Sequence, residues 1–228
     1  MSQRSTTGFC RFDGVRIRTL TRNRGTILMW LGAALWFGAV LAAMAWMTNY
    51  SFRPGPEIIA REDWPNESLI KQDVSQPTLL LFAHPRCPCT RATLEELARL
   101  TARCQGRFTT QVWFTKPVGV SDDWMQTDLW RTAEKIPGVS VHVDEAGREA
   151  VRFGAQTSGH AMLYDPAGHL LFQGGITISR GHAGDNPGRA ALEQILADNI
   201  VSSGNSHTPV FGCLLANPAQ CEEATCKR

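Results

Sequence analysis

One segment, residues 79–100, constrains the fold of this 228-residue chain more than any other. It opens with an uncharged apolar run, Leu79 to Ala83, whose length and composition are typical of a buried strand. A three-residue turn leads to Cys87-Pro88-Cys89, and leucines then follow at helical spacing: Leu94, Leu97 and Leu100. The pattern predicts a strand, a short turn and a helix that begins at the two cysteines.

This placement of two cysteines has a chemical consequence. Free backbone N–H groups and the helix dipole stabilise a thiolate at a helix N-terminus, so the pKa of a cysteine there falls. We therefore expect Cys87 to be the attacking thiolate and Cys89 to be the thiol that resolves a mixed disulfide. A Cys-x-Cys disulfide closes a smaller ring than Cys-x-x-Cys. Its greater strain predicts a more oxidising pair.

The segment resembles the active-site region of thioredoxin-like proteins, which consists of a strand, a small residue, Cys-x-Pro-Cys and a helix. It is most similar to the membrane-anchored, extracytoplasmic thiol-disulfide group (TlpA/ResA-like), and more narrowly to the RedB-like proteins. Pro88 stands before the second cysteine as in these proteins, although the spacing is one residue shorter. The resemblance implies an oxidoreductase with a redox-active centre and no cofactor. Its partners would be protein thiols or disulfides of the cell envelope.

The remaining pattern fits this fold class. A β-branched and aromatic run at 108–116 and an alternating run at 139–143 predict strands, and 161–173 predicts a hairpin around a Pro/Gly turn. Helices are expected over about 122–135, between 145 and 153, and after Asn186-Pro187. We therefore expect an α/β thioredoxin-like mixed sheet with helices on both faces, over residues 77–200.

The N-terminal part predicts a membrane anchor. Residues 1–26 are rich in arginine, and residues 27–47 are uncharged and long enough to span a bilayer as a helix. The positive-inside rule places the N-terminus in the cytoplasm and the domain in the periplasm, on a bacterial-type inner membrane. A cleaved signal peptide is the alternative, since Ala43-Met44-Ala45 fits a cleavage site. The length of the apolar segment favours an uncleaved signal-anchor.

Two further segments flank the predicted domain. Residues 48–76 contain three prolines and predict an extended stalk, and 201–228 form a tail with Cys213, Cys221 and Cys226. Six of the seven cysteines follow the apolar segment, which suits an oxidising compartment. Cys213 is a candidate third redox thiol. Structural disulfides within the tail are the alternative that we favour.

Other residues are candidates for tuning the cysteines. His84 and Arg86 precede Cys87, where each could add positive charge beside the thiol. The resemblance implies a cis-proline just before the first hairpin strand, but Gly159 occupies that place, with His160 beside it. Glycine permits close backbone approach without imposing a cis bond.

Two alternative functions use the same residues. A copper(I) carrier could bind the metal with Cys87, Cys89, His84 and His160, which offer soft sulfur and imidazole ligands. A redox-inactive interaction domain is the second alternative. The formal charge is +2, and beyond the arginine-rich N-terminus acidic residues outnumber basic ones, so the sequence predicts no nucleic-acid surface.

Overall fold

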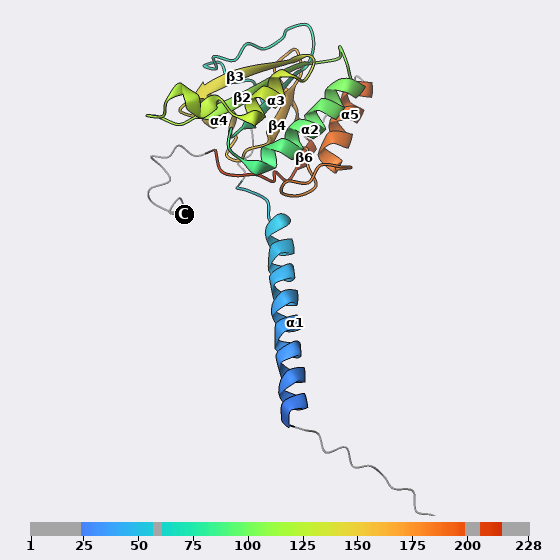
Figure 1. Cartoon of the computed structure of the whole chain (residues 1–228). Helices are drawn as coiled ribbons and strands as arrows, with labels where there is room; N and C mark the ends of the chain where they lie inside the picture. Colours follow the sequence, from blue (N-terminus) through green and yellow to red (C-terminus); the bar gives the residue numbers. More distant parts are fainter. Residues whose placement is uncertain (1–23, 57–60, 199–205, 216–228) are drawn as a thin grey trace, which may run out of the picture. The chain divides into compact units, whose positions relative to one another are not determined.

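A computed structural model describes residues 24–56, 61–198 and 206–215. The chain divides into two compact units, Met1–Trp46 and Met47–Arg228. The first contains most of helix α1, and the second contains the sheet and the remaining helices (Figure 1).

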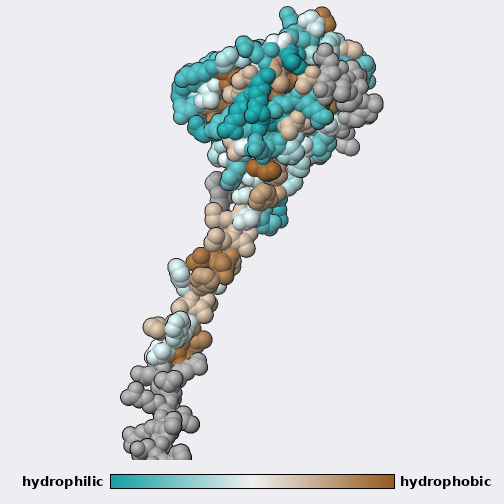
Figure 2. Space-filling model, turned by 90° about the vertical axis from the view of Figure 1, so that its right-hand side faces the viewer, coloured by the Kyte–Doolittle hydropathy of each residue, from teal (hydrophilic) through white to brown (hydrophobic). Residues whose placement is uncertain are grey.

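Helix α1 (Arg24–Ser51) has 28 residues, none of them buried. At about 1.5 Å per residue it is about 42 Å long, more than the hydrocarbon core of a bilayer requires. Hydrophobic residues gather along it in Figure 2, whereas the visible face of the other unit is largely hydrophilic. Within the described ranges, it is the one helix long and apolar enough to cross a membrane.

The second unit is built on a six-stranded sheet with the order β3-β2-β1-β4-β5-β6. The β1-β2, β2-β3 and β5-β6 pairs are parallel, and the β1-β4 and β4-β5 pairs are antiparallel. The strands are β1 (Thr78–Ala83), β2 (Thr109–Lys116), β3 (Val139–Glu145), β4 (His160–Tyr164), β5 (Leu170–Gly175) and β6 (Ser206–Thr208). Strand β1 is buried along its whole length, which explains its uninterrupted apolar sequence.

Helices cover both faces of this sheet. They are α2 (Pro88–Arg103), α3 (Asp128–Glu134), α4 (Arg148–Phe153) and α5 (Pro187–Asp198). Helices α2 and α5 lie side by side on one face in Figure 1. Successive side chains of β1 point to opposite faces of the sheet. Leu79 and Leu81 pack in the core that contains the leucines of α2. Leu80 and Phe82 pack in the core that contains Phe153 of α4.

The structure confirms the expected fold class, a mixed thioredoxin-like sheet with helices on both faces. One expected helix, over about 122–135, is wrong in detail. The chain forms a 3₁₀ turn at Asp122–Met125 and then α3. Thr127 separates them because its hydroxyl accepts a hydrogen bond from the Trp130 N–H, so it caps a new helix. The sequence pattern did not predict β6.

The segments that flank the predicted domain also contact it. The ring of Trp64 meets Phe153 and Tyr164 edge to face, with centroids 5.1 Å apart in both pairs. At the other end, β6 extends the sheet beyond residue 200. The compact unit is therefore larger than the 77–200 domain expected from the sequence, and Cys213 is part of it.

Candidate active site at the start of helix α2

The turn after β1 delivers Cys87 to the N-terminus of α2. Cys87 is the N-cap residue, with the extended backbone angles φ −84° and ψ 118°, and Pro88 occupies the first helical position. Proline suits that position because its missing N–H would have no partner in the helix. The Cys87 side chain makes no capping hydrogen bond, so its sulfur lies by the positive end of the helix dipole without being used as a cap.

Cys87 has two sulfur neighbours at this point. The Sγ of Cys87 lies 2.9 Å from the Sγ of Cys213, which is 126 residues further along the chain. The thiol of Cys89 also hydrogen-bonds to Cys87. Cys87 is 1% exposed, whereas the other two cysteines are half-buried. The structure therefore brings together the two cysteines of the motif and one cysteine of the tail.

The contacts among these thiols separate their acidities. The pKa of Cys87 is lowered, chiefly by its interaction with the Cys213 thiol and then with the Cys89 thiol, and burial opposes this shift. The pKa of Cys89 and that of Cys213 are raised, first by the interaction with Cys87 and then by partial desolvation. These contacts therefore favour the thiolate form at Cys87 and the thiol form at Cys89 and Cys213.

Ser158 connects the parts of the chain that form the site. Its hydroxyl accepts a hydrogen bond from the His84 N–H at 2.8 Å and lies 2.9 Å from the hydroxyl of Thr90 in α2. Its own N–H donates to the carbonyl of Cys213 at 2.7 Å. This single residue therefore links the turn after β1, helix α2 and the tail. No local sequence pattern indicates this residue, because its partners are at least 55 positions away.

Arg180 is a second residue that sequence reasoning missed. One guanidinium nitrogen donates to the carbonyl of Gly212 at 2.5 Å, and another donates to the carbonyl of Arg53 at 3.2 Å. Its charge opposes the upward shifts in pKa at Cys89 and Cys213. It is thus a cation beside Cys89 and Cys213.

Two of the expected tuning residues lie in the turn after β1. The Nδ1 of His84 accepts the N–H of Arg86 at 3.1 Å, and burial lowers the pKa of His84 while the nearby Cys87 opposes that shift. The guanidinium of Arg86 lies over the ring of Trp124, 3.8 Å from its centroid. This stacking is a cation–π contact.

Gly159 and His160 follow Ser158. Gly159 has φ +95°, and an added Cβ would lie 3.0 Å from the Thr93 hydroxyl, so glycine suits both the backbone and the space. The described residues contain no cis peptide bond. His160 begins β4 and is 1% exposed; neither ring nitrogen has a hydrogen-bond partner, and burial lowers its pKa to about 4. In the ranges that the structure covers, no three His, Cys, Asp or Glu side chains are grouped to hold a metal ion.

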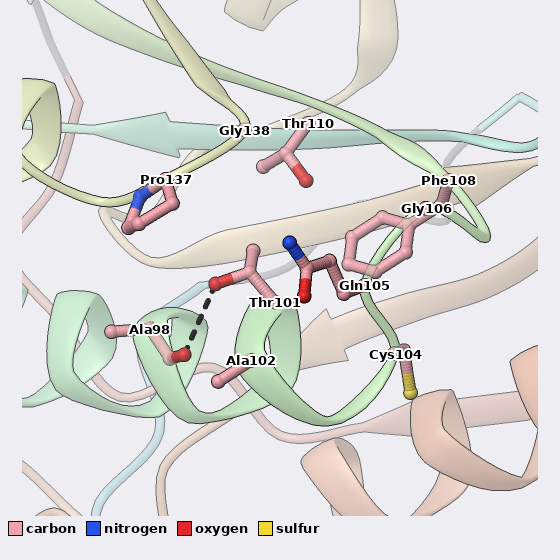
Figure 3. Close-up of a pocket in the computed structure, with 10 residues that line it drawn as sticks. All are labelled: Ala98, Thr101, Ala102, Cys104, Gln105, Gly106, Phe108, Thr110, Pro137 and Gly138. Atoms are coloured by element: carbon pink, nitrogen blue, oxygen red, sulfur yellow. Dashed lines mark hydrogen bonds between the residues drawn. The ribbon is translucent and has the colours of Figure 1, made fainter.

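A pocket of about 270 Å³ lies elsewhere, at the C-terminal end of α2. Figure 3 shows the residues that line it, among them Thr101, Phe108 and Pro137. Cys104 lines it as well, but its sulfur points away from the other labelled side chains. None of the site cysteines reaches this pocket. Cys221 and Cys226, the other expected tail thiols, lie outside the described residues.

No protein-family model and no curated protein matches this sequence. Solved structures do resemble it. An uncharacterised conserved protein from Geobacillus kaustophilus is 19% identical, with 72% of this chain and 92% of that chain covered and a TM-score of 0.50. A hypothetical protein from Sinorhizobium meliloti is 20% identical, with 63% and 80% covered and a TM-score of 0.49. A secreted disulfide oxidoreductase from Mycobacterium tuberculosis is 17% identical, with 54% and 81% covered and a TM-score of 0.38.

At these identities the likeness concerns the fold. The sheet order, with helices on both faces, fits the fold class expected from the sequence.

Proposed function

We propose that this protein is a membrane-anchored thiol-disulfide oxidoreductase of the TlpA/ResA-like group, most similar to its RedB-like members. One observation carries the proposal. Cys87 is the N-cap residue of a helix that follows a buried strand, and its pKa is lowered by two neighbouring thiols. A thiolate at neutral pH is the species that attacks a disulfide, so the site contains the nucleophile that the reaction needs.

The exchange proceeds in two steps. The Cys87 thiolate attacks one sulfur of a partner disulfide, a mixed disulfide forms at Cys87, and the partner's other sulfur leaves as a thiolate. A second thiol of the site then attacks Cys87 and releases the partner. Cys89 is the resolving thiol that the motif predicts, and it lies within hydrogen-bonding reach of Cys87. Two electrons pass from the protein to the partner, and the same steps in reverse oxidise a dithiol partner.

The proposed location follows from α1. With α1 as an uncleaved anchor and the arginine-rich N-terminus in the cytoplasm, the second unit lies on the extracytoplasmic side of the membrane. Its partners would be protein thiols and disulfides of the cell envelope. An oxidising compartment of that kind is where exchange between cysteines is sustained.

The test uses the full-length chain in detergent, with metal ions removed by a chelator. We expect the reduced wild-type protein to reduce a model disulfide and the oxidised protein to oxidise a model dithiol. We expect Cys87→Ser to do neither. Cys104→Ala is the matched control, because Cys104 is a buried core cysteine that lies outside the site. Thiol-disulfide exchange by Cys87→Ser at the wild-type rate would refute the proposal.

A further inference from the structure

The inference concerns the segment that carries Cys213, and it rests on the proposed function. This segment is fixed at both ends. At one end β6 pairs with β5, with Ser206 opposite Phe172 and Thr208 opposite Gly174. At the other end Leu214 forms an antiparallel bridge with Thr157, and the Leu215 N–H donates to the carbonyl of Gln156 at 2.8 Å. Cys213 is therefore held by backbone pairing on both sides, in the manner of a strand residue.

Glycine lets this segment approach the site closely. A Cβ added to Gly212 would lie 1.9 Å from the carbonyl oxygen of Ser158, a distance that no side chain tolerates. A larger residue at position 212 would therefore push the segment away from Ser158. Because the Ser158 N–H bonds the carbonyl of Cys213, such a shift would also move the Cys213 sulfur. The sequence Gly212-Cys213 is thus required for the sulfur contact.

The two possible partners of Cys87 differ in geometry. Cys89 is the second residue of the helix and lies within reach of Cys87, but a bond between these two would close a small, strained ring. Cys213 approaches from outside the helix, and its sulfur lies 2.9 Å from that of Cys87. A disulfide bond is about 2.05 Å long, so a shift of less than about 1 Å would close it. Arg180 binds the Gly212 carbonyl and favours the thiolate of Cys213 as well.

We propose that the redox-active disulfide of this protein joins Cys87 to Cys213. In the reduced form the pair is one thiolate, on Cys87, and one thiol, on Cys213. When a partner disulfide is reduced, its S–S bond breaks and the Cys87–Cys213 bond forms. Two electrons go to the partner, whose sulfurs leave as one thiolate and one thiol that takes the Cys213 proton. A dithiol partner reverses the reaction, and Cys89 remains a thiol throughout.

The test follows the disulfides directly in the full-length protein, in detergent with a chelator. Wild type, Cys89→Ser, Cys213→Ser, Cys87→Ser and the core control Cys104→Ala are equilibrated in graded reduced and oxidised glutathione. Free thiols are then alkylated, and disulfide-linked peptides are mapped by mass spectrometry. Thermal melting of the reduced proteins checks that each variant is folded. Cys213→Ala serves as a second variant if the serine form unfolds.

We expect wild type, Cys104→Ala and Cys89→Ser to yield a Cys87–Cys213 peptide that titrates as one two-electron couple. In Cys213→Ser the Cys87–glutathione adduct should rise by about tenfold or more, since its resolving thiol is gone. A Cys87–Cys89 disulfide in wild type that is unaffected by Cys213→Ser would overturn the inference. So would a Cys87–Cys213 bond that no glutathione buffer reduces, because that would be a structural disulfide.

Failure of the proposed function looks different. In that case Cys87 forms neither a glutathione adduct nor a protein disulfide in any variant, wild type included. A working Cys87 with Cys89 as its only disulfide partner would instead keep the proposed function and remove the role of Cys213.

Discussion

At the residue scale, the charge on Cys87 depends on its two sulfur neighbours. A neighbouring thiol that favours the charged form lowers the pKa, and the larger such effect on Cys87 comes from Cys213. The effect has a definite sign. Removal of the donor raises the pKa of Cys87, so a higher pH is needed to form the thiolate.

The direction of this pKa change can be measured by the ultraviolet absorbance of the thiolate as a function of pH. The Cys87 signal is the absorbance of wild type minus that of Cys87→Ser. We expect the Cys87 signal to persist well below the ordinary cysteine pKa of about 8.5. In Cys213→Ala the midpoint should rise, because the larger of the two effects that lower the pKa of Cys87 is lost. A wild-type midpoint near the ordinary value would contradict the charge assignment.

Arg180 acts on the other two thiols, as a positioning residue. Its positive charge favours the thiolate forms of Cys89 and Cys213, and its hydrogen bond to Gly212 orients the tail. For Arg180→Gln we expect disulfide closure to slow about three- to tenfold at neutral pH, with the pH profile moved to higher pH. Arg180→Lys should restore the pH profile in part, since it keeps the charge.

The matched control for Arg180 is Arg131→Gln. Arg131 is an exposed arginine whose salt bridge is with Asp128. Its removal should leave the rate of closure and its pH profile as in wild type. Equal slowing in Arg180→Gln at every pH, without a shift of the profile, would indicate a purely structural role for Arg180.

At the element scale, a buried carboxylate joins α2 to the start of α5. Glu96 in α2 is fully buried, and its oxygens accept hydrogen bonds from Arg189 at 2.6 Å, Asn186 at 3.1 Å and the Gly184 N–H at 2.8 Å. Arg189 is itself almost completely buried. These bonds fix the helix that carries the cysteines against its neighbour.

Removal of this carboxylate should strongly destabilise the protein. Glu96→Ala leaves the Gly184 N–H and the Asn186 amide without this buried acceptor, whereas Arg189 keeps its ion pairs with Glu193 and Asp185. A buried polar group that is left unsatisfied typically costs about 1–3 kcal/mol in the free energy of unfolding. Arg99, which also contacts Glu96 but is half exposed, is the control; Arg99→Ala should cost about 1 kcal/mol or less. Urea unfolding of the second unit in the full-length protein measures both, and similar values for the two variants would refute the argument.

At the scale of the whole molecule, the proposed topology can be tested in intact spheroplasts with a membrane-impermeant maleimide. A chain with Cys10 as its sole cysteine should be labelled only after lysis. A cysteine-free chain that carries Asp123→Cys, an exposed position in the second unit, should be labelled without lysis. The reverse pattern would overturn the orientation. An intact mass without the first 45 or so residues would show a cleaved signal instead of an anchor.

Much of this fold could be predicted from the sequence because its signals are local. The apolar run of β1, the leucine spacing of α2 and the Pro/Gly turn between β4 and β5 each lie within a few residues. The start of α2 at Cys87 was predictable for the same reason. Thr127 shows the limit: it caps α3 through a hydrogen bond that apolar spacing does not reveal.

The rest of the site depends on contacts between distant parts of the chain. Cys213 meets Cys87 only because Gly212 can touch the backbone of Ser158, and Arg180 reaches the tail through a carbonyl that could belong to any residue. No local spacing of residues in the sequence predicts these contacts. Cys213 could be named as a candidate thiol, but its partner could not be predicted.

Strand β6 has a consequence for solubility. Strand β5 is buried along its whole length, and β6 covers the side of it that faces away from β4. An uncovered apolar edge strand is a template for pairing with another molecule. A chain that lacked residues 206–215 would lose the Cys213 thiol. It would also expose the edge of β5, and we expect it to aggregate for that reason. The ten residues that hold this sulfur in place thus also keep neighbouring copies from joining their sheets.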